Sequence, residues 1–237
     1  MNRKLRAGAA RVALDPPIGL AMAGYGRRVG RSAGVHDSLN VQAIVIGDGE
    51  SKIAIAGVDL LALGTRICAA VAEEVAASSD IAREAVIVCA THTHSAPNFN
   101  IFATPGPAAK PSHGRDLEWE RTIPRKIAAG ILAADSSMEP AVIRTAGVEF
   151  GLGTNRRLRR ADGTIQLAAN YAGPVDHQAV GLGAYRINGS SIGFIINYGC
   201  HGVMLCEDNL CYSRDWPGFA LDAIERAEGK RRRPRDR

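Results

Sequence analysis

The chain has 237 residues, of which 46% are hydrophobic and 22% charged, values that are ordinary for a globular protein and exclude a disordered or fibrous one. The formal net charge of +5 is local, because residues 230–237 carry six basic residues and one acidic residue, so the remaining chain is neutral. A neutral body offers no electrostatic attraction to a polyanion, and we therefore expect no nucleic-acid partner.

The sequence shows no sign of export or of membrane insertion. The N-terminal residues lack an apolar leader, and no window is long and apolar enough for a transmembrane helix. The five cysteines are odd in number and unevenly spaced, which does not indicate a disulfide framework. We expect a reduced, cytoplasmic protein.

Hydrophobic periodicity predicts alternating strands and helices. Strands are expected at residues 5–15, 39–46, 53–58, 86–90, 141–150, 179–187 and 191–197, and helices at residues 63–77, 116–134 and 216–227. Asn188-Gly189 is a strong hairpin signal, and Pro124 should either kink its helix or begin a second one. The pattern indicates an α/β or α+β protein without a linker between domains.

Long loops separate some of these elements. Residues 18–38 are rich in glycine, with Tyr25 as the expected anchor, and residues 95–115 are rich in proline, glycine and alanine. A loop as long as residues 95–115 is uncommon in a compact domain and is often functional. A third loop precedes an Asp162-Gly163 turn.

Two histidines follow the strand expected at residues 86–90. His92 and His94 are separated by one residue, and in an extended chain such side chains point to the same face. Two imidazoles directed at one point can bind a metal ion. The alternative is a pair of loop histidines that bond to the backbone.

A third histidine, His201, also follows an apolar strand through glycine. Ligand pockets gather at strand ends, and a catalytic zinc ion usually takes three protein ligands and keeps one position open for water. Cys200, Cys206 and Cys211 surround His201, but their spacing matches no zinc knuckle. The His-Glu-x-x-His helix of zincins is absent.

The most specific motif is Thr91-His92-Thr93-His94-Ser95-Ala96-Pro97. This motif and further segments, in the same order along the chain, resemble the neutral/alkaline (non-lysosomal) ceramidase family. The further segments are residues 7–12, 15–17, 23–26, 35–37, 57–61, 154–157, 175–176, 197–201 and 213–218. The similarity spans about residues 5–229. It implies an α/β fold with mixed sheets flanked by helices.

The resemblance implies a zinc-dependent hydrolase of a linear amide. In the family a metal-activated water attacks the amide carbonyl of an N-acyl sphingoid base, releasing fatty acid and amine, so the partner would be a small-molecule or lipid amide. Carried over to this chain, His92 and His201 would bind Zn²⁺. His94 would assist proton transfer or hold the substrate, and Arg156 would contact substrate oxygens.

Asp59 and Asp215 stand at a strand end and before a helix. Each is expected either to accept a hydrogen bond from a ligand imidazole or to cap a turn or helix.

Family members continue beyond the matched region with a Gly-Asp-x-x-Pro segment, an acidic zinc ligand and a tyrosine near the metal. None of these has a counterpart here. We therefore expect a partial domain over residues 1–229 and a disordered basic tail at residues 230–237. The alternative to an enzyme is a truncated, inactive fragment or a binding-only protein of the same fold.

Overall fold

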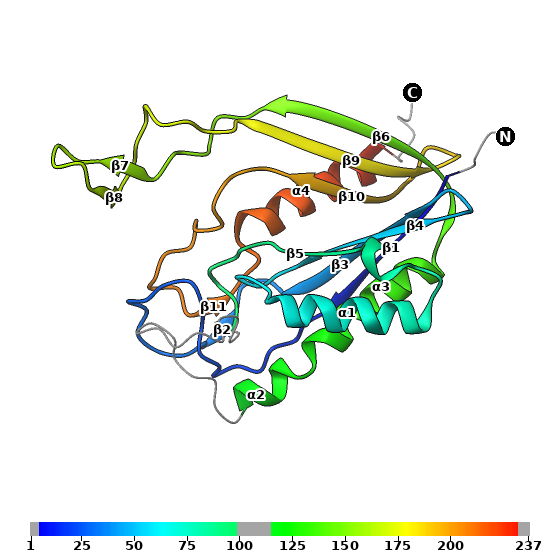
Figure 1. Ribbon diagram of the computed structural model, residues 1–237, viewed down its shortest axis with the longest axis horizontal. Coiled ribbons are helices and arrows are strands. Elements are labelled where there is room, and N and C mark those ends of the chain that lie inside the picture. Colours follow the sequence, from blue (N-terminus) through cyan, green and yellow to red (C-terminus); the bar gives the residue numbers. More distant parts are fainter. Residues whose placement is uncertain (1–4, 99–114, 232–237) are drawn as a thin grey trace.

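The computed structural model describes residues 5–98 and 115–231 and is built around one large mixed sheet (Figure 1). Its seven strands follow the order β10-β9-β6-β1-β3-β4-β5. The strands are β1 (Arg6–Ala13), β3 (Asn40–Gly47), β4 (Lys52–Val58), β5 (Val86–Ala90), β6 (Glu139–Glu149), β9 (Gln178–Arg186) and β10 (Ser191–Asn197). Two small sheets pair β2 (Gly34–Val35) with β11 (Cys211–Tyr212) and β7 (Arg157–Arg159) with β8 (Ile165–Leu167). The helices are α1 (Thr65–Ser78), α2 (Arg115–Glu120), α3 (Ile123–Ser136) and α4 (Asp215–Arg231), with a 3₁₀ turn η1 (Arg83–Ala85).

A hairpin and a crossover form the centre of the sheet. β3 and β4 are antiparallel, and in their turn Gly49 takes a φ of 93° while the Asp48 carboxylate accepts hydrogen bonds from the Glu50 and Ser51 amides. β4 then leads through α1 to β5, which pairs parallel to it. Because the two parallel strands end together, the loops after β4 and β5 meet at one edge of the sheet.

Helices α1 and α3 cover one face of this sheet, and the main core lies beneath them. Val41, Val45, Val58, Ile127 and Ile131 are each fully buried there. The helix α3 also lies directly on β1, since a β-carbon built on Gly8 would be 2.0 Å from the Ala134 carbonyl oxygen. Only glycine fits at this crossing.

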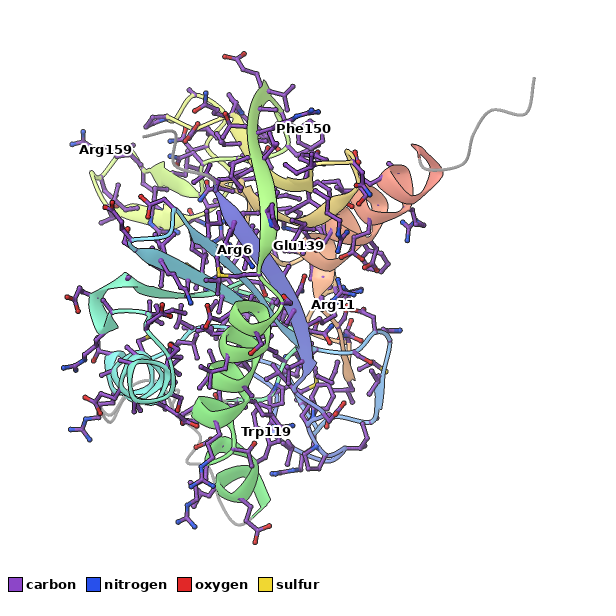
Figure 2. All side chains as sticks on the ribbon, turned by 90° about the vertical axis from the view of Figure 1, so that its right-hand side faces the viewer. Arg6, Arg11, Trp119, Glu139, Phe150 and Arg159 are labelled. Carbon is purple, nitrogen blue, oxygen red and sulfur yellow. The ribbon has the colours of Figure 1, made fainter. Side chains whose placement is uncertain are left out.

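The other face is covered differently. β6 pairs with β1 only at the Arg6 and Ala7 positions, after which β6, β9 and β10 fold over the sheet. A β-carbon built on Gly193 of β10 would lie 2.8 Å from the Ala9 β-carbon of β1, so the two strands are in close contact. The buried residues on this side are few and mostly small, and a cavity of about 570 Å³ remains between the sheet, β10 and α4. Figure 2 shows β6 running past β1, with α4 on the outside.

The α/β class with mixed sheets and flanking helices is confirmed, and β5 has the predicted bounds. Pro124 begins the separate helix α3 in its first turn, so the middle helix is divided in two. The short strands β2, β7, β8 and β11 were not predicted. The loop expected to be functional lies largely outside the described residues, as does the basic tail after Arg231.

Candidate metal centre

The first histidine loop leaves the sheet edge where β4 and β5 end together. The Thr91 amide donates to the Val58 carbonyl, and the His92 amide donates to the Leu60 carbonyl. The backbone then turns sharply, because His92 has a φ of 64°, a left-handed value that is uncommon for a residue other than glycine. His92 and His94 therefore do not share a strand face as expected; the turn, not strand alternation, brings their rings together at 5.1 Å between centroids.

His201 approaches from the second layer, after β10. The His94 amide donates to the Gly202 carbonyl over 3.2 Å and joins the two loops. The Nε2 atom of His201 lies 2.9 Å from Nε2 of His92 and 3.1 Å from Nε2 of His94. The three imidazoles thus point their Nε2 atoms at one another from two distant parts of the chain.

This donor set suits a metal ion. Candidate ligand atoms of the three histidines lie within 4.8 Å of one another, the one such group found in the described residues. Nitrogen ligands at the usual Zn–N distance of about 2.0 Å around a tetrahedral ion are separated by about 3.3 Å. The observed Nε2 separations are close to that value, so a small adjustment of the rings would admit Zn²⁺.

Contacts around the His92 and His94 rings fix their orientations. The Nδ1 atom of His92 lies 2.6 Å from the Leu61 carbonyl oxygen, so it donates there and leaves the Nε2 lone pair for the centre. Gly24, with a φ of 98°, presses against His94, since a β-carbon on it would lie 2.5 Å from Nδ1 of that ring. Tyr25 packs edge-on against the same ring.

The protonation state of two of the imidazoles suits metal binding. Burial, followed by the charges of His201, His92 and Arg28, lowers the pKa of His94 to about 4. Burial, followed by the charges of Arg156 and His92, lowers the pKa of His201 to about 4. Both imidazoles are neutral at pH 7, the form in which histidine binds metal ions.

Arg156 lies at the edge of this centre. It is exposed, and its charge acts on His201, but within the described chain no hydrogen bond joins it to the three histidines. The neighbouring Asn155 anchors its segment through a hydrogen bond from Nδ2 to the Pro174 carbonyl. The guanidinium is therefore free to meet a ligand.

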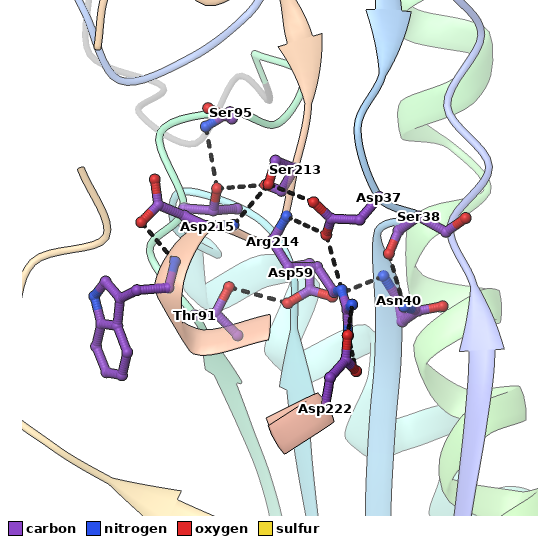
Figure 3. A network of polar contacts seen from close by, with 12 residues as sticks. Asp37, Ser38, Asn40, Asp59, Thr91, Ser95, Ser213, Arg214, Asp215 and Asp222 are labelled. Carbon is purple, nitrogen blue, oxygen red and sulfur yellow. Dashed lines mark hydrogen bonds and ion pairs between the residues drawn. The ribbon is translucent and has the colours of Figure 1, made fainter. Parts of the chain in front are cut away.

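Asp59 and Asp215 belong to a network of polar contacts that holds backbone in place (Figure 3). Among the described residues, no hydrogen bond joins either carboxylate to an imidazole. The buried Asp59 carboxylate accepts hydrogen bonds from the Asn40 amide and the Thr91 hydroxyl. The Asp215 carboxylate accepts from the amides of Met204, Leu205 and Trp216, and its own φ is 55°. Asp215 thus fixes the loop that follows His201 and lies at the start of α4. Of the two roles expected for these aspartates, the contacts of the described residues show the backbone-capping role and not the bond to a ligand imidazole.

A polar clamp that the sequence did not reveal lies next to these aspartates. Arg214, which is 7% exposed, forms ion pairs with Asp37 at 2.9 Å and with Asp222 at 2.7 Å. Ser213 donates to the same Asp37 carboxylate. The clamp joins the start of α4 to the loop before β3, and its sequence signals were the matched segments at residues 35–37 and 213–218.

Comparisons with known proteins place this geometry in context. Residues 9–237 match the family described as neutral/alkaline non-lysosomal ceramidase, N-terminal. A solved structure titled "Ceramidase complexed with C2" is 21% identical with a TM-score of 0.74, covering 92% of this chain and 34% of its own. The crystal structure of neutral ceramidase from Pseudomonas aeruginosa is 20% identical with a TM-score of 0.72, covering 93% of this chain and 35% of its own. The chain therefore spans about a third of the length of these structures. A search of curated proteins found no match.

Proposed function

The chain belongs to the neutral/alkaline non-lysosomal ceramidase family, and from this we propose that it is a zinc-dependent hydrolase of a linear amide bond. The observation that carries the proposal is the convergence of three imidazoles, with Nε2 atoms 2.9 Å and 3.1 Å apart. The substrate we propose is a lipid or small-molecule N-acyl amide of the ceramide type, since the matched structures are titled as ceramidases.

His92 and His201 are proposed to hold the zinc ion. Their Nε2 atoms are adjacent, and the Leu61 carbonyl directs that of His92 inward. Zinc lowers the pKa of bound water to about 7 and so makes hydroxide available at neutral pH. Two imidazoles leave room for further ligands, and His94 is near enough to serve as a third.

His94 and Arg156 are proposed to act on the substrate. The buried, neutral His94 ring presents Nε2 to the centre, where it can assist proton transfer or hold the substrate. The Arg156 guanidinium can donate hydrogen bonds to a substrate oxygen and stabilise negative charge that develops on it. Neither role requires the ring or the guanidinium to bind the metal.

Zinc content and amide hydrolysis together test the proposal. The purified chain should bind one zinc ion per molecule and hydrolyse a fluorescent N-acyl sphingosine analogue, and both properties should be lost in His92→Ala and His201→Ala. His177→Ala, at an exposed histidine that does not belong to this group of three, is the matched control and should retain both. A chain without stoichiometric zinc at micromolar metal would instead support the alternative of an inactive or binding-only protein of this fold.

No helix within residues 5–98 and 115–231 is long and apolar enough to cross a bilayer.

A further inference from the structure

Between β6 and β9 the chain leaves the main sheet and forms a projecting hairpin from β7 and β8 (Figure 1). Its turn is locally stable, because Gly163 has a φ of 84° and the Asp162 carboxylate accepts hydrogen bonds from the Thr164 amide and hydroxyl. The Arg160 amide closes the hairpin by donating to the Thr164 carbonyl. The hairpin therefore does not depend on the main sheet for its shape.

The pairing register decides which side chains share a face. Arg157 pairs with Leu167 and Arg159 pairs with Ile165, and directly opposed residues of an antiparallel pair lie on the same side. One face thus combines Arg157, Arg159, Ile165 and Leu167. Ile165 is 59% exposed and Leu167 is 68% exposed. Figure 2 shows Arg159 reaching outward at the edge of the molecule.

The base of the hairpin is anchored next to the histidines. The Tyr198 hydroxyl accepts hydrogen bonds from the Leu152 and Gly153 amides, each over 3.0 Å, and Tyr198 stands three residues before His201. Asn155 accepts a hydrogen bond from the Asn170 amide at its carbonyl and one from the Arg157 amide at its side chain. A surface or molecule that binds the hairpin would therefore be held at a fixed position relative to the three histidines.

An exposed face of this composition requires an explanation. A two-stranded hairpin has no core of its own, and exposed large aliphatic side chains that lie together indicate a surface that meets another body. Residues 156–167 contain four arginines and one aspartate, so the segment is strongly basic. Arginines beside aliphatic residues on one exposed face are typical of contact with a lipid interface, where aliphatic groups enter the surface and guanidinium groups meet anionic headgroups.

We propose that the Arg157–Arg159–Ile165–Leu167 face of this hairpin binds the surface of an anionic lipid bilayer. The face belongs to a hairpin that projects from the main sheet, so a broad surface can reach it (Figure 1). Its charge complements anionic headgroups, whereas a second copy of the same face would oppose arginine to arginine. The inference does not depend on zinc chemistry, but it would place a lipid amide close to the proposed site.

Vesicle co-sedimentation of the full chain tests the proposal. The chain should bind vesicles that contain phosphatidylglycerol and should not bind pure phosphatidylcholine vesicles. Arg157→Gln/Arg159→Gln should weaken binding about thirtyfold at low ionic strength, since each basic residue near such a surface contributes about fivefold. Ile165→Ser/Leu167→Ser should remove the part of the binding that resists salt.

Matched variants elsewhere on the surface control for charge and apolar area. Arg66→Gln/Arg121→Gln removes two exposed arginines from the helical side, and Val29→Ser/Ile187→Ser removes two exposed aliphatic residues outside the hairpin. Both should bind anionic vesicles like the unchanged chain. Circular dichroism should show all four double variants folded.

Three results would overturn the proposal. They are no binding of the unchanged chain to anionic vesicles, equal weakening in the hairpin and control variants, and a dimer in solution that Ile165→Ser/Leu167→Ser dissociates without any effect on vesicles. His92→Ala should bind vesicles normally. A failure of the proposed zinc hydrolysis can thus be distinguished from a failure of lipid binding.

Discussion

The two faces of the main sheet are built from different residues. The face beneath α1 and α3 buries large aliphatic side chains completely, with Val41, Val58 and Ile131 among them. The opposite face buries mostly alanine, leaves a cavity of about 570 Å³ under α4, and relies on polar contacts such as the Arg214 clamp. The contrast indicates that the helical face supplies most of the stability, while the second layer mainly positions His201 against His92.

The largest effect should come from the helical face. Ile131→Ala should lower the free energy of unfolding by about 3–4 kcal/mol, because a fully buried isoleucine leaves a cavity that its neighbours cannot fill. The matched change on the other face, Ile195→Ala, should cost only about 1 kcal/mol, since this side chain is partly buried beside existing empty space. Urea denaturation measures both, and equal losses would contradict the proposed division between the faces.

The polar clamp should be the next most important contribution. Arg214→Met should lower the free energy of unfolding by about 2 kcal/mol, because it leaves the carboxylates of Asp37 and Asp222 without their partner in partly buried positions. Arg83→Met, at an exposed arginine paired with Glu73, is the control and should cost less than about 0.5 kcal/mol. A small effect at Arg214 would show that α4 is held by its apolar contacts instead.

Asp59, at the end of β4, should make stability depend on pH. Burial raises its pKa from 3.8 to about 7, so the folded state holds this proton more tightly than the unfolded chain does. The contribution of Asp59 to stability is then greatest below about pH 4 and is lost as the pH rises toward 7.

The measurement is urea denaturation at pH 5 and pH 8. Asp59→Asn should remove a decline of about 2 kcal/mol between these two pH values. Asp176→Asn, at an exposed aspartate, should leave the decline unchanged. An identical pH profile in Asp59→Asn and the unchanged chain would mean that Asp59 is already ionised at pH 5.

The smallest effect on stability, but a specific one on metal binding, is expected at Asp215. Asp215→Asn replaces one carboxylate oxygen by an NH₂ group. That oxygen accepts a hydrogen bond from a backbone N–H of the loop after His201, and the NH₂ group cannot accept it. Zinc affinity should fall about tenfold while the unfolding midpoint changes little. Competition with a chelating dye measures the affinity, and Asp222→Asn serves as the comparison on α4. Equal affinities in the Asp215→Asn chain and the unchanged chain would mean that the loop does not need this anchor.

Much of the fold was predictable because its elements carry long patterns. The apolar run of β5 and the Asn188-Gly189 turn between β9 and β10 appear where the sequence indicates. The hairpin of β7 and β8 was not predictable, since strands of three residues are too short to show alternation. Its Asp162-Gly163 turn was the only local signal.

The histidine centre was predictable in composition but not in geometry. Residue order and family resemblance indicated His92, His94 and His201, and the structure brings their rings together. The left-handed turn at His92, the contact of Gly24 with His94, and the backbone roles of Asp59 and Asp215 depend on three-dimensional neighbours. No spacing rule in the sequence could reveal them.

The contact between His92 and His201 joins residues that are 109 positions apart in the chain. Closing so long a loop costs conformational entropy that the bond between two imidazoles cannot offset by itself. We therefore expect the β3–β4 hairpin and the crossover to β5 to form early in folding, and the histidine centre to form late, after β10 has folded over β1. The three imidazoles proposed to hold the metal ion would therefore come together only at the last stage of folding.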